Sequence, residues 1–389
     1  MMRSEGGAVM KLLRIQVDGH TFFKDHLVDM DFIARDRVTE EYEVNHLFGS
    51  IYTKTAMAVC GVNASGKTTL LEVLRTVTNI FVNGRSVREF IQADRYLANT
   101  VFTIWFYQDN AIYELRSQLK KVDKKWLFEE EELRKKPVSR GNTRKKLFVF
   151  TDKDLLMKRS KEDTRFLPDD VTMLTSLLKH SKTEAIDHMH YTEHNELGIS
   201  GDIPTKFTQL LDPSIEYIRR DPKQEGNVCM KFHGRPEITV PEEDQQLYLS
   251  SGTVKGLNFL GYGYLALQSG GYFIVDEIEN HFHKAIVEIL LHFFADPEVN
   301  AFGATLIFST HYVEILESMD RKDTIYITRK TEEGITVGSF SSENVRNDMK
   351  KSDLFLSNRL EGTAPSYSRY MELKRDLVKN IQSKVEETV

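Results

Sequence analysis

A glycine-rich octet has the residue types and spacing that are needed to hold phosphate groups. Residues 61–68 read GVNASGKT, which matches G-x-x-x-x-G-K-[ST]. In this pattern glycines let backbone N–H groups surround phosphates, the lysine reaches the terminal phosphates and the hydroxyl binds Mg²⁺. The alternative is a tight turn that happens to contain a lysine. We expect nucleotide binding by Gly61, Asn63, Ala64, Ser65, Gly66, Lys67, Thr68 and Thr69, with Lys67 also catalytic and Thr68 also a metal ligand.

Two carboxylates and a histidine form a second candidate group, because each follows a buried strand. Asp276 and Glu277 come directly after the apolar run Tyr272–Val275. His311 follows the run Ala304–Phe308. Beside a phosphate-binding loop, one carboxylate is needed to hold Mg²⁺ and another to orient or deprotonate the attacking water. We therefore assign Asp276 to the metal, and Glu277 and His311 to catalysis, although a lone histidine is more often structural.

The elements around these residues alternate between strands and helices. The run Thr55–Cys60 predicts a strand that leads into the glycine loop, and the apolar spacing beyond the loop predicts a helix to about Val77. Strands alternating with helices predict an α/β fold with a mixed, mainly parallel sheet covered on both faces. The other predicted elements are strands at 12–17, 26–33, 215–219, 227–232, 238–240, 272–275 and 304–308, and helices at about 253–268 and 284–294.

The middle of the chain interrupts this alternation. Two runs at 101–107 and 111–119 predict a hairpin around Gln108-Asp109-Asn110. The following segment, Lys120–Lys146, is basic, with eleven Lys and Arg against five Asp and Glu. From Asp152 to about Leu197 the apolar spacing predicts an inserted α-helical lobe. We therefore expect three segments: 1–119 with the glycine loop, 120–212 with the basic segment and the lobe, and 213–389 with the second half of the nucleotide-binding core and a C-terminal helix.

The composition is that of an ordinary globular protein. Of the 389 residues, 40% are hydrophobic and 28% are charged, so the chain can bury a large core. No apolar run approaches the roughly 20 residues that cross a bilayer, no secretory signal is recognisable, and two cysteines cannot make a disulfide framework. We expect a cytoplasmic protein without membrane contact. The formal net charge of −6 is too small to indicate a nucleic-acid-binding protein from bulk charge alone.

The order of the motifs resembles that of a known family. GVNASGKTTLLEVL, a hairpin, LSSGTVKGL, FIVDEIENHFH and LIFSTHYVEIL follow one another as in ABC-type AAA family ATPases related to the overcoming-lysogenization-defect (OLD) proteins and to SMC-type heads. More narrowly, the chain is similar to the ATPase subunits of two-gene anti-phage modules of the AbiLi/RloA type and the PARIS AriA type. The resemblance covers nearly the whole chain. It implies an ABC-ATPase-like P-loop NTPase core, ATP and Mg²⁺ as cofactors, and slow, regulatory hydrolysis.

The resemblance also suggests roles for individual residues. Asp276 and Glu277 look like the Walker B pair, His311 like the switch histidine, and His283 lies in the D-loop position. No Q-loop glutamine is assigned, because Gln108 lies in a predicted hairpin turn.

A signature loop is expected at residues 249–253, which read LSSGT in place of the common LSGGQ. Ser250, Ser251 and Gly252 would bind the nucleotide that Lys67 of another copy holds, so the active site would be shared between copies. Ser251 and Thr253 depart from the usual signature. Taken alone, the same residues are an ordinary helix N-cap.

The intervals between the motifs separate subclasses of this family. No sustained heptads follow the glycine loop, so a long SMC-type arm is not expected. OLD-type proteins carry their own nuclease domain, whereas only residues 312–389 follow His311. We therefore expect a homo-oligomeric ATPase that senses phage, or that scaffolds and controls a separate nuclease-like effector encoded nearby, in anti-phage defence. The alternatives are an SMC-head-like ATPase acting on DNA in repair or chromosome maintenance, and a pure scaffold.

Three further features give weaker indications. The basic segment could bind nucleic acid or a phage protein, with Trp126 and Phe128 as stacking residues, but a solvated loop is the expected state. A histidine cluster could bind zinc, although surface histidines are expected. The C-terminal stretch 370–385 has an apolar stripe that we expect to pack on the chain's own core, with docking to a partner as the alternative. The cluster comprises His188, His190 and His194 beside Glu193, and the stripe comprises Leu373, Leu377, Ile381 and Val385.

Overall fold

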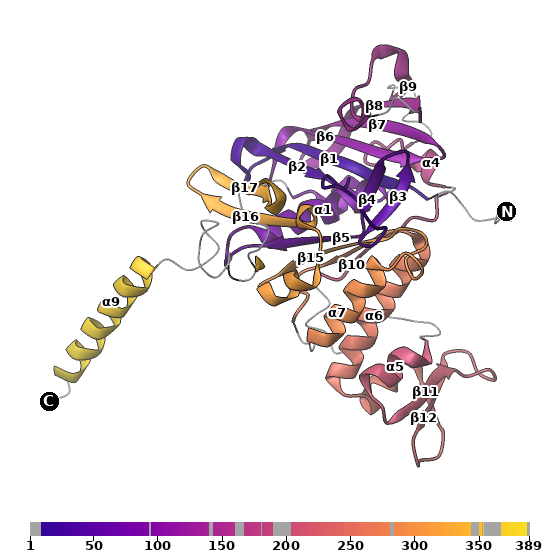
Figure 1. The fold of residues 1–389 in the computed structure, drawn as a ribbon, viewed down its shortest axis with the longest axis vertical. Coiled ribbons are helices and arrows are strands. Elements are labelled where there is room, and N and C mark those ends of the chain that lie inside the picture. Colours follow the sequence, from indigo (N-terminus) through magenta and orange to yellow (C-terminus); the bar gives the residue numbers. More distant parts are fainter. Residues whose placement is uncertain are drawn as a thin grey trace.

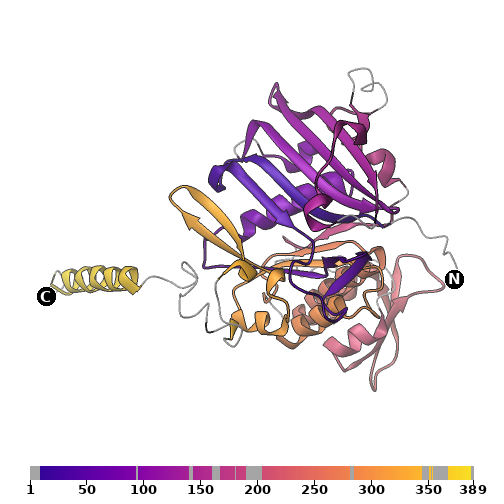
Figure 2. The same ribbon diagram turned by 45° about the horizontal axis from the view of Figure 1, so that its top comes forward.

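Two six-stranded sheets dominate the computed structural model (Figure 1). The structure describes residues 9–386 except 93–94, 140–142, 160–166, 180, 190–203, 281–283, 344–349, 352 and 354–366. The sheets lie one above the other, and Figure 2 shows the same two layers from a second direction.

The lower sheet is mainly parallel and carries the predicted catalytic motifs. Its first five strands are parallel, and only the last, β17, is antiparallel to its neighbour. This arrangement confirms the predicted α/β fold with a largely parallel sheet. In order across the sheet the strands are β10 (Ala185–Asp187), β14 (Tyr272–Val275), β15 (Thr305–Thr310), β5 (Ala56–Cys60), β16 (Ile325–Thr331) and β17 (Gly334–Ser339).

Side chains of this sheet alternate between two cores. Met57 and Val59 face the core that α1 (Lys67–Phe81) and the upper sheet share, whereas Ala58 and Cys60 face the core of α6 (Ser251–Ser269) and α7 (Lys284–Ala295). The strands are therefore apolar on both faces, as expected for a parallel sheet that helices cover. Because each parallel strand ends at the same edge, the segments after β5, β14 and β15 meet there.

The upper sheet is entirely antiparallel. The turn Asp109-Asn110 joins β6 and β7, and both residues have positive φ, 49° and 55°, so the predicted hairpin is confirmed. In order across the sheet the strands are β2 (Leu27–Asp31), β1 (Lys11–His20), β6 (Tyr96–Gln108), β7 (Ala111–Val122), β8 (Lys125–Pro137) and β9 (Leu155–Lys158).

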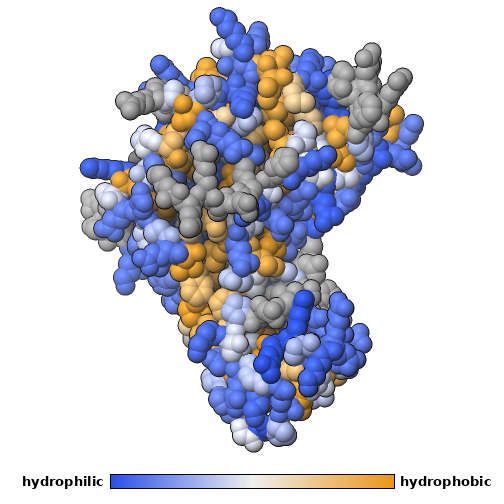
Figure 3. Space-filling view, turned by 90° about the vertical axis from the view of Figure 1, so that its right-hand side faces the viewer, coloured by the Kyte–Doolittle hydropathy of each residue, from blue (hydrophilic) through white to orange (hydrophobic). Residues whose placement is uncertain are grey.

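A small lobe projects from the N-terminal half of α6. The three-stranded sheet β11 (Ile215–Arg220), β12 (Asn227–Phe232) and β13 (Ile238–Pro241) packs with α5 (Thr205–Leu211) around Leu257 of α6. Figure 3 shows that the lobe, at the foot of the molecule, carries mostly hydrophilic side chains on the face seen there. The three strands confirm the sequence prediction.

The remaining elements are short, except for the C-terminal helix. None of the helices within the described ranges is long and apolar enough to span a membrane. These elements are the hairpin strands β3 (Val44–Phe48) and β4 (Ile51–Lys54), the helices α2 (Val87–Phe90), α3 (Arg144–Leu147), α4 (Thr175–Leu178) and α9 (Tyr367–Glu386), and 3-10 turns at Lys24–His26 (η1), Asp152–Asp154, Glu242–Tyr248 (η5), Val313–Ser318, Lys322–Thr324 and Phe340–Ser342.

The α-helical lobe expected from Asp152 to about Leu197, within the segment 120–212, is wrong for the part of it that the structure describes. Leu155, Leu156 and Met157 lie in the stretch for which the spacing predicts helices, but they form the edge strand β9, and α4 is a single turn. Runs of three or four apolar residues cannot separate a helix from a strand, and here pairing with β8 decides the outcome. Residues 190–203 lie outside the described part, and the division of the chain into three segments stays a prediction.

The basic segment is not a solvated loop over its first half, because Lys125–Pro137 is the strand β8. Trp126 and Phe128 are each 3% exposed and pack into the main core, so neither can stack on a nucleic-acid base. The sequence EEEE at 129–132 reads as a charged surface, but Glu131 is fully buried. Its carboxylate accepts hydrogen bonds from Ser117, Arg159, Thr172 and the backbone of Met173.

Candidate functional site

The glycine loop connects β5 to α1 in a conformation that depends on glycine. Gly61 has φ 155°, and a Cβ there would lie 2.4 Å from Oγ of Ser65 and 2.7 Å from the backbone oxygen of Thr328. Gly66 is the N-cap of α1 with φ 107°, a left-handed conformation that other residues rarely adopt. The first N–H groups of α1 have no partner within the helix and therefore face the loop. This cradle is suited to a phosphate group.

Lys67 is folded back over the loop. Its Nζ donates to the backbone oxygens of Gly61 at 3.0 Å and Val62 at 3.2 Å, and lies 3.3 Å from Nδ1 of His311. Burial lowers the pKa of Lys67, and nearby acidic groups such as Asp276 and Glu277 oppose that shift. Exchanging carbonyl partners for phosphate oxygens would improve the electrostatic environment of this ammonium group.

A hydroxyl and a carboxylate meet at the mouth of the loop. Thr68 Oγ1 donates to Oδ2 of Asp276 at 2.7 Å, and Ser309 Oγ donates to the other oxygen of Asp276. Mg²⁺ is commonly bound by one or two protein oxygens together with phosphates and water. Within the described residues there is no cluster of three or more His, Cys, Asp and Glu side chains that could hold a metal without such help. Thr68 and Asp276 therefore fit a Mg²⁺ that accompanies a bound nucleotide.

Glu277 and His311 face each other across the same edge of the sheet. Nε2 of His311 lies 3.2 Å from Oε1 of Glu277, so the imidazole spans the gap between Lys67 and this carboxylate. The side chain of Asn280 donates to the other oxygen of Glu277, and the backbone N–H of Glu277 donates to Ser309 at 2.7 Å. The side chain of Glu277 is 41% exposed, which leaves it open to water.

A cavity of about 1060 Å³ lies beside Lys67, Glu277 and His311, and Asp276 is not part of its lining. Its lining includes Asn63, Ala64, Gly66, Lys67, Thr68, Thr69, Glu277 and His311, all of which the sequence predicted. The opposite wall was not predicted and consists of Thr21, Phe22 and residues 330–335 of the β16–β17 hairpin. Phe22 is 45% exposed. The only sequence signal for this wall was an aromatic residue after the first strand, which is too common to be informative.

The residues of the expected signature loop lie elsewhere. Ser250, Ser251 and Gly252 are exposed and do not line this cavity. Ser250 is the N-cap of α6, and its Oγ accepts a hydrogen bond from the backbone of Thr253 at 3.0 Å. Within one chain these residues therefore act as a helix cap, and a role in binding nucleotide requires a second copy.

The candidate zinc residues do not form a site in the described part of the chain. His188 is 1% exposed, which contradicts the expected surface position, and burial lowers its pKa to about 4. Its ring lies against those of Tyr262 and Phe273. His190, Glu193 and His194, and likewise the D-loop candidate His283, lie outside the described residues.

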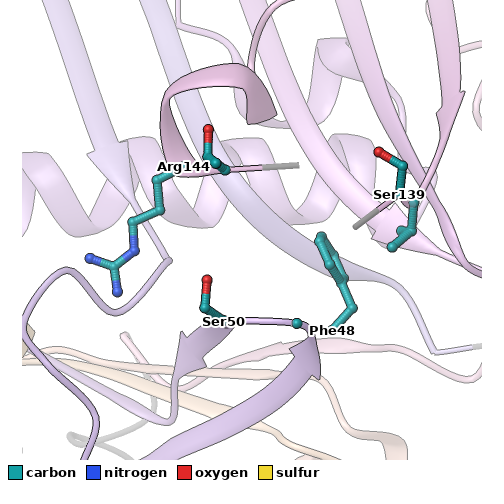
Figure 4. Close-up of a pocket in the computed structure, with 7 residues that line it drawn as sticks. Phe48, Ser50, Ser139 and Arg144 are labelled. Carbon is teal, nitrogen blue, oxygen red and sulfur yellow. The ribbon is translucent and has the colours of Figure 1, made fainter. Parts of the chain in front are cut away.

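A second cavity, of about 510 Å³, lies between the β3–β4 turn and the segment that follows β8 (Figure 4). Phe48, Ser50, Ser139 and Arg144 line it, and the guanidinium of Arg144 donates to the backbone oxygen of Arg35. Because this cavity contains none of the predicted site residues, we assign it no chemistry.

A parallel sheet whose strand leads through such a glycine loop into a helix is the arrangement of P-loop nucleotide-binding proteins. Residues 56–317 match the family described as "AAA domain, putative AbiEii toxin, Type IV TA system". The match covers well over half of the chain and spans every motif from the glycine loop to His311, so this protein belongs to that AAA family. No curated protein matches the sequence significantly.

Proposed function

We propose that this chain is an ATPase that binds ATP with Mg²⁺ and hydrolyses it slowly, assembles with copies of itself, and controls a separate toxic effector in anti-phage defence. The observation that carries the proposal is the meeting of Lys67, Thr68, Asp276, Glu277 and His311 at one edge of the parallel sheet. Their side chains come from three segments far apart in the sequence.

The chemistry of hydrolysis follows from these positions. Backbone N–H groups of the loop and Lys67 would bind the β- and γ-phosphates, with Thr68 and Asp276 holding Mg²⁺. Bound Mg²⁺ would neutralise charge that develops on the phosphate oxygens. Glu277 would accept a proton from the attacking water. His311, which contacts both Lys67 and Glu277, would sense the γ-phosphate between them.

The unpredicted wall supports a nucleoside rather than a simple phosphate as the ligand. An exposed aromatic ring at Phe22 offers a stacking surface for a base. Glu332 and Glu333 line the same cavity and offer acceptors for hydroxyl or amino groups.

A shared active site is supported by the exposed N-terminus of α6. The dipole of this 19-residue helix favours an anion at Ser250. Leu247 and Tyr248, in the preceding turn η5, are 76% and 50% exposed. Exposed apolar side chains beside a helix N-terminus suit an interface that closes over a phosphate.

The defence role rests on the resemblance to ATPases of two-gene anti-phage modules and on the family description, which names a toxin of a type IV toxin–antitoxin system. The alternative of an ATPase that acts on DNA is less well supported, because Trp126 and Phe128, the candidates for stacking on bases, are buried. A separate effector would need a docking element, for which α9 is the candidate.

Phosphate release from ATP by the purified chain tests the enzymatic part. We expect Mg²⁺-dependent release that Lys67→Ala abolishes together with nucleotide binding. Glu277→Gln should retain binding and lose turnover by roughly a hundredfold or more. Equal turnover of wild-type and Glu277→Gln proteins would contradict the assignment of the base.

Co-expression with the adjacent open reading frame tests the effector. We expect its product to co-purify with this chain, and to be toxic to cells when it is expressed without this chain.

A further inference from the structure

Glu279 is buried in the turn after β14, close to the candidate site but outside its cavity. The residue is only 8% exposed. Its Oε1 accepts a hydrogen bond from the backbone N–H of His311 at 2.5 Å. Its Oε2 is buried and has no hydrogen-bond partner among the described residues. Burying a carboxylate with one unpaired oxygen lowers the stability of the fold. We therefore look for a functional role of Glu279.

The hydrogen bond of Glu279 adds to a set of hydrogen bonds that joins residues 277–279, after β14, to residues 309–311, at the end of β15. Ser309 accepts a hydrogen bond from Glu277 N–H at 2.7 Å, and its backbone oxygen accepts from Ile278 N–H at 3.0 Å. These contacts fix the segment up to Ser309. The hydrogen bond to Glu279 fixes the backbone two residues further on, at His311. The side chain of His311 is exposed, and within the described part of the chain its ring nitrogens contact Lys67 and Glu277.

We propose that Glu279 is a positioning residue for ATP hydrolysis: it holds the main chain of His311 so that the imidazole stays between Lys67 and Glu277. The inference rests on the proposed ATPase function. Glu279 does not line the cavity, and its hydrogen bond within the described part of the chain goes to the backbone of His311. Burial lowers the pKa of Lys67 and the charge of Glu279 opposes that shift, so Glu279 also acts on Lys67 electrostatically. Nothing in the chemistry of phosphate transfer requires a third carboxylate at this place.

Two substitutions separate the hydrogen bond from the shape of the side chain. Glu279→Leu keeps a similar volume and removes the acceptor. Glu279→Gln keeps a carbonyl oxygen that can accept from His311 N–H. We expect Glu279→Leu to lower kcat by about tenfold or more with little change in the Kd for ATP, and Glu279→Gln to recover turnover to within about threefold of the wild type.

A double-mutant cycle with His311→Ala decides whether the effect passes through the histidine. If it does, Glu279→Leu costs almost nothing in the His311→Ala background. Equal losses in both backgrounds would show that Glu279 contributes only to general stability or acts elsewhere, and would overturn the inference.

A readout without nucleotide separates this inference from the proposed function. In a spectrum of isotope-labelled histidine rings, the His311 signal is assigned by its absence in His311→Ala. We expect the signal to move in Glu279→Leu and to stay near its wild-type position in Glu279→Gln, while signals of the other histidines remain in place and report an intact fold. An unmoved His311 signal in Glu279→Leu would refute the positioning role. A wild-type chain that releases no phosphate would refute the ATPase function instead, and the spectrum would still decide the role of Glu279.

Discussion

Glu277 adopts a backbone conformation that its side chain does not favour. Its φ is 47°, and a left-handed conformation costs a residue other than glycine of order 1 kcal/mol. Hydrogen bonds to Ser309 compensate for this cost, because Glu277 N–H donates to its Oγ and Ile278 N–H donates to its backbone oxygen. The strained turn directs the carboxylate of Glu277 toward His311. Strain of this kind is typical of residues that a structure holds in place for chemistry.

At the residue scale, the sequence predicts a site residue only where that residue belongs to a short, recognisable motif. Lys67 and Thr68 follow from the octet, and Asp276 from an apolar strand that ends in acids. Ser309 and Glu279 were missed, since nothing in their local sequence distinguishes them from ordinary polar residues. Their roles exist only because β15 lies beside β14 in the sheet.

His188 leads to a prediction about pH and stability. Its pKa is about 4 in the folded chain against a usual 6.5, so below pH 6.5 the unfolded state binds more protons than the folded state. Stability should therefore fall as pH falls, by about 2 kcal/mol between pH 7 and pH 5 from this residue. Urea unfolding of wild-type and His188→Phe proteins at both pH values measures the difference. A loss of stability that is equal in the two proteins would show that His188 is not the cause.

At the scale of elements, the β16–β17 hairpin leads to a prediction about nucleotide affinity. The hairpin is held against the loop of Phe22, since Ile335 N–H donates to Phe22 O at 2.8 Å and a Cβ on Gly334 would lie 2.7 Å from the backbone nitrogen of Lys24. Phe22→Ala should weaken ATP binding by roughly tenfold through loss of stacking, which is worth about 1–3 kcal/mol per base.

Calorimetric titration with ATP measures this effect, and inorganic triphosphate provides the control. Triphosphate has no base, so its affinity should be the same for wild-type and Phe22→Ala proteins. Phe22→Tyr should bind ATP nearly as well as the wild type. If Phe22→Ala weakens both ligands equally, the ring supports the phosphate site rather than a base.

Elements were predictable where periodicity was long and unambiguous. The strand before the glycine loop, α1, α6 and α7 lie within a few residues of their predicted positions. β8 was missed because a β-bulge breaks the alternation of its inward residues: Trp126 and Phe128 face inward before the bulge, and Glu131 and Leu133 after it. β9 was assigned to a helix because its pairing partner lies about twenty residues earlier in the chain, beyond any local pattern.

At the scale of the whole molecule, α9 is set apart from the two sheets in both views (Figures 1 and 2). Leu373, Leu377 and Ile381 are 58%, 50% and 62% exposed, so the expectation that this stripe packs on the chain's own core is wrong. Replacing Leu373 and Leu377 by Asp should change the melting temperature of the isolated chain by no more than about 2 °C. A drop of several degrees would show that the helix does pack on its own chain. Loss of co-purification with the adjacent gene product, at unchanged stability, would identify α9 as the docking element.

A shared active site makes a prediction that only an assembly can satisfy. Lys67→Ala disables the pocket of a copy but leaves its α6 N-terminus intact. Ser250→Asp leaves the pocket intact and keeps a good helix cap, yet sets a negative charge against the phosphate. Each variant alone should be inactive. If two copies exchange freely and share their sites, an equal mixture should recover about a quarter of wild-type turnover, because half of the dimers are mixed and each holds one intact site.

The matched control is Ser250→Asn, which also caps the helix but adds no charge. It should retain most of its turnover without any mixing. Turnover in the mixture should rise with protein concentration, since the active species is a dimer or larger assembly. At concentrations where the wild type is active, the mixture could instead be no more active than the sum of its two variants. That result would mean that each chain completes its own site and that Ser250 serves only as a helix cap.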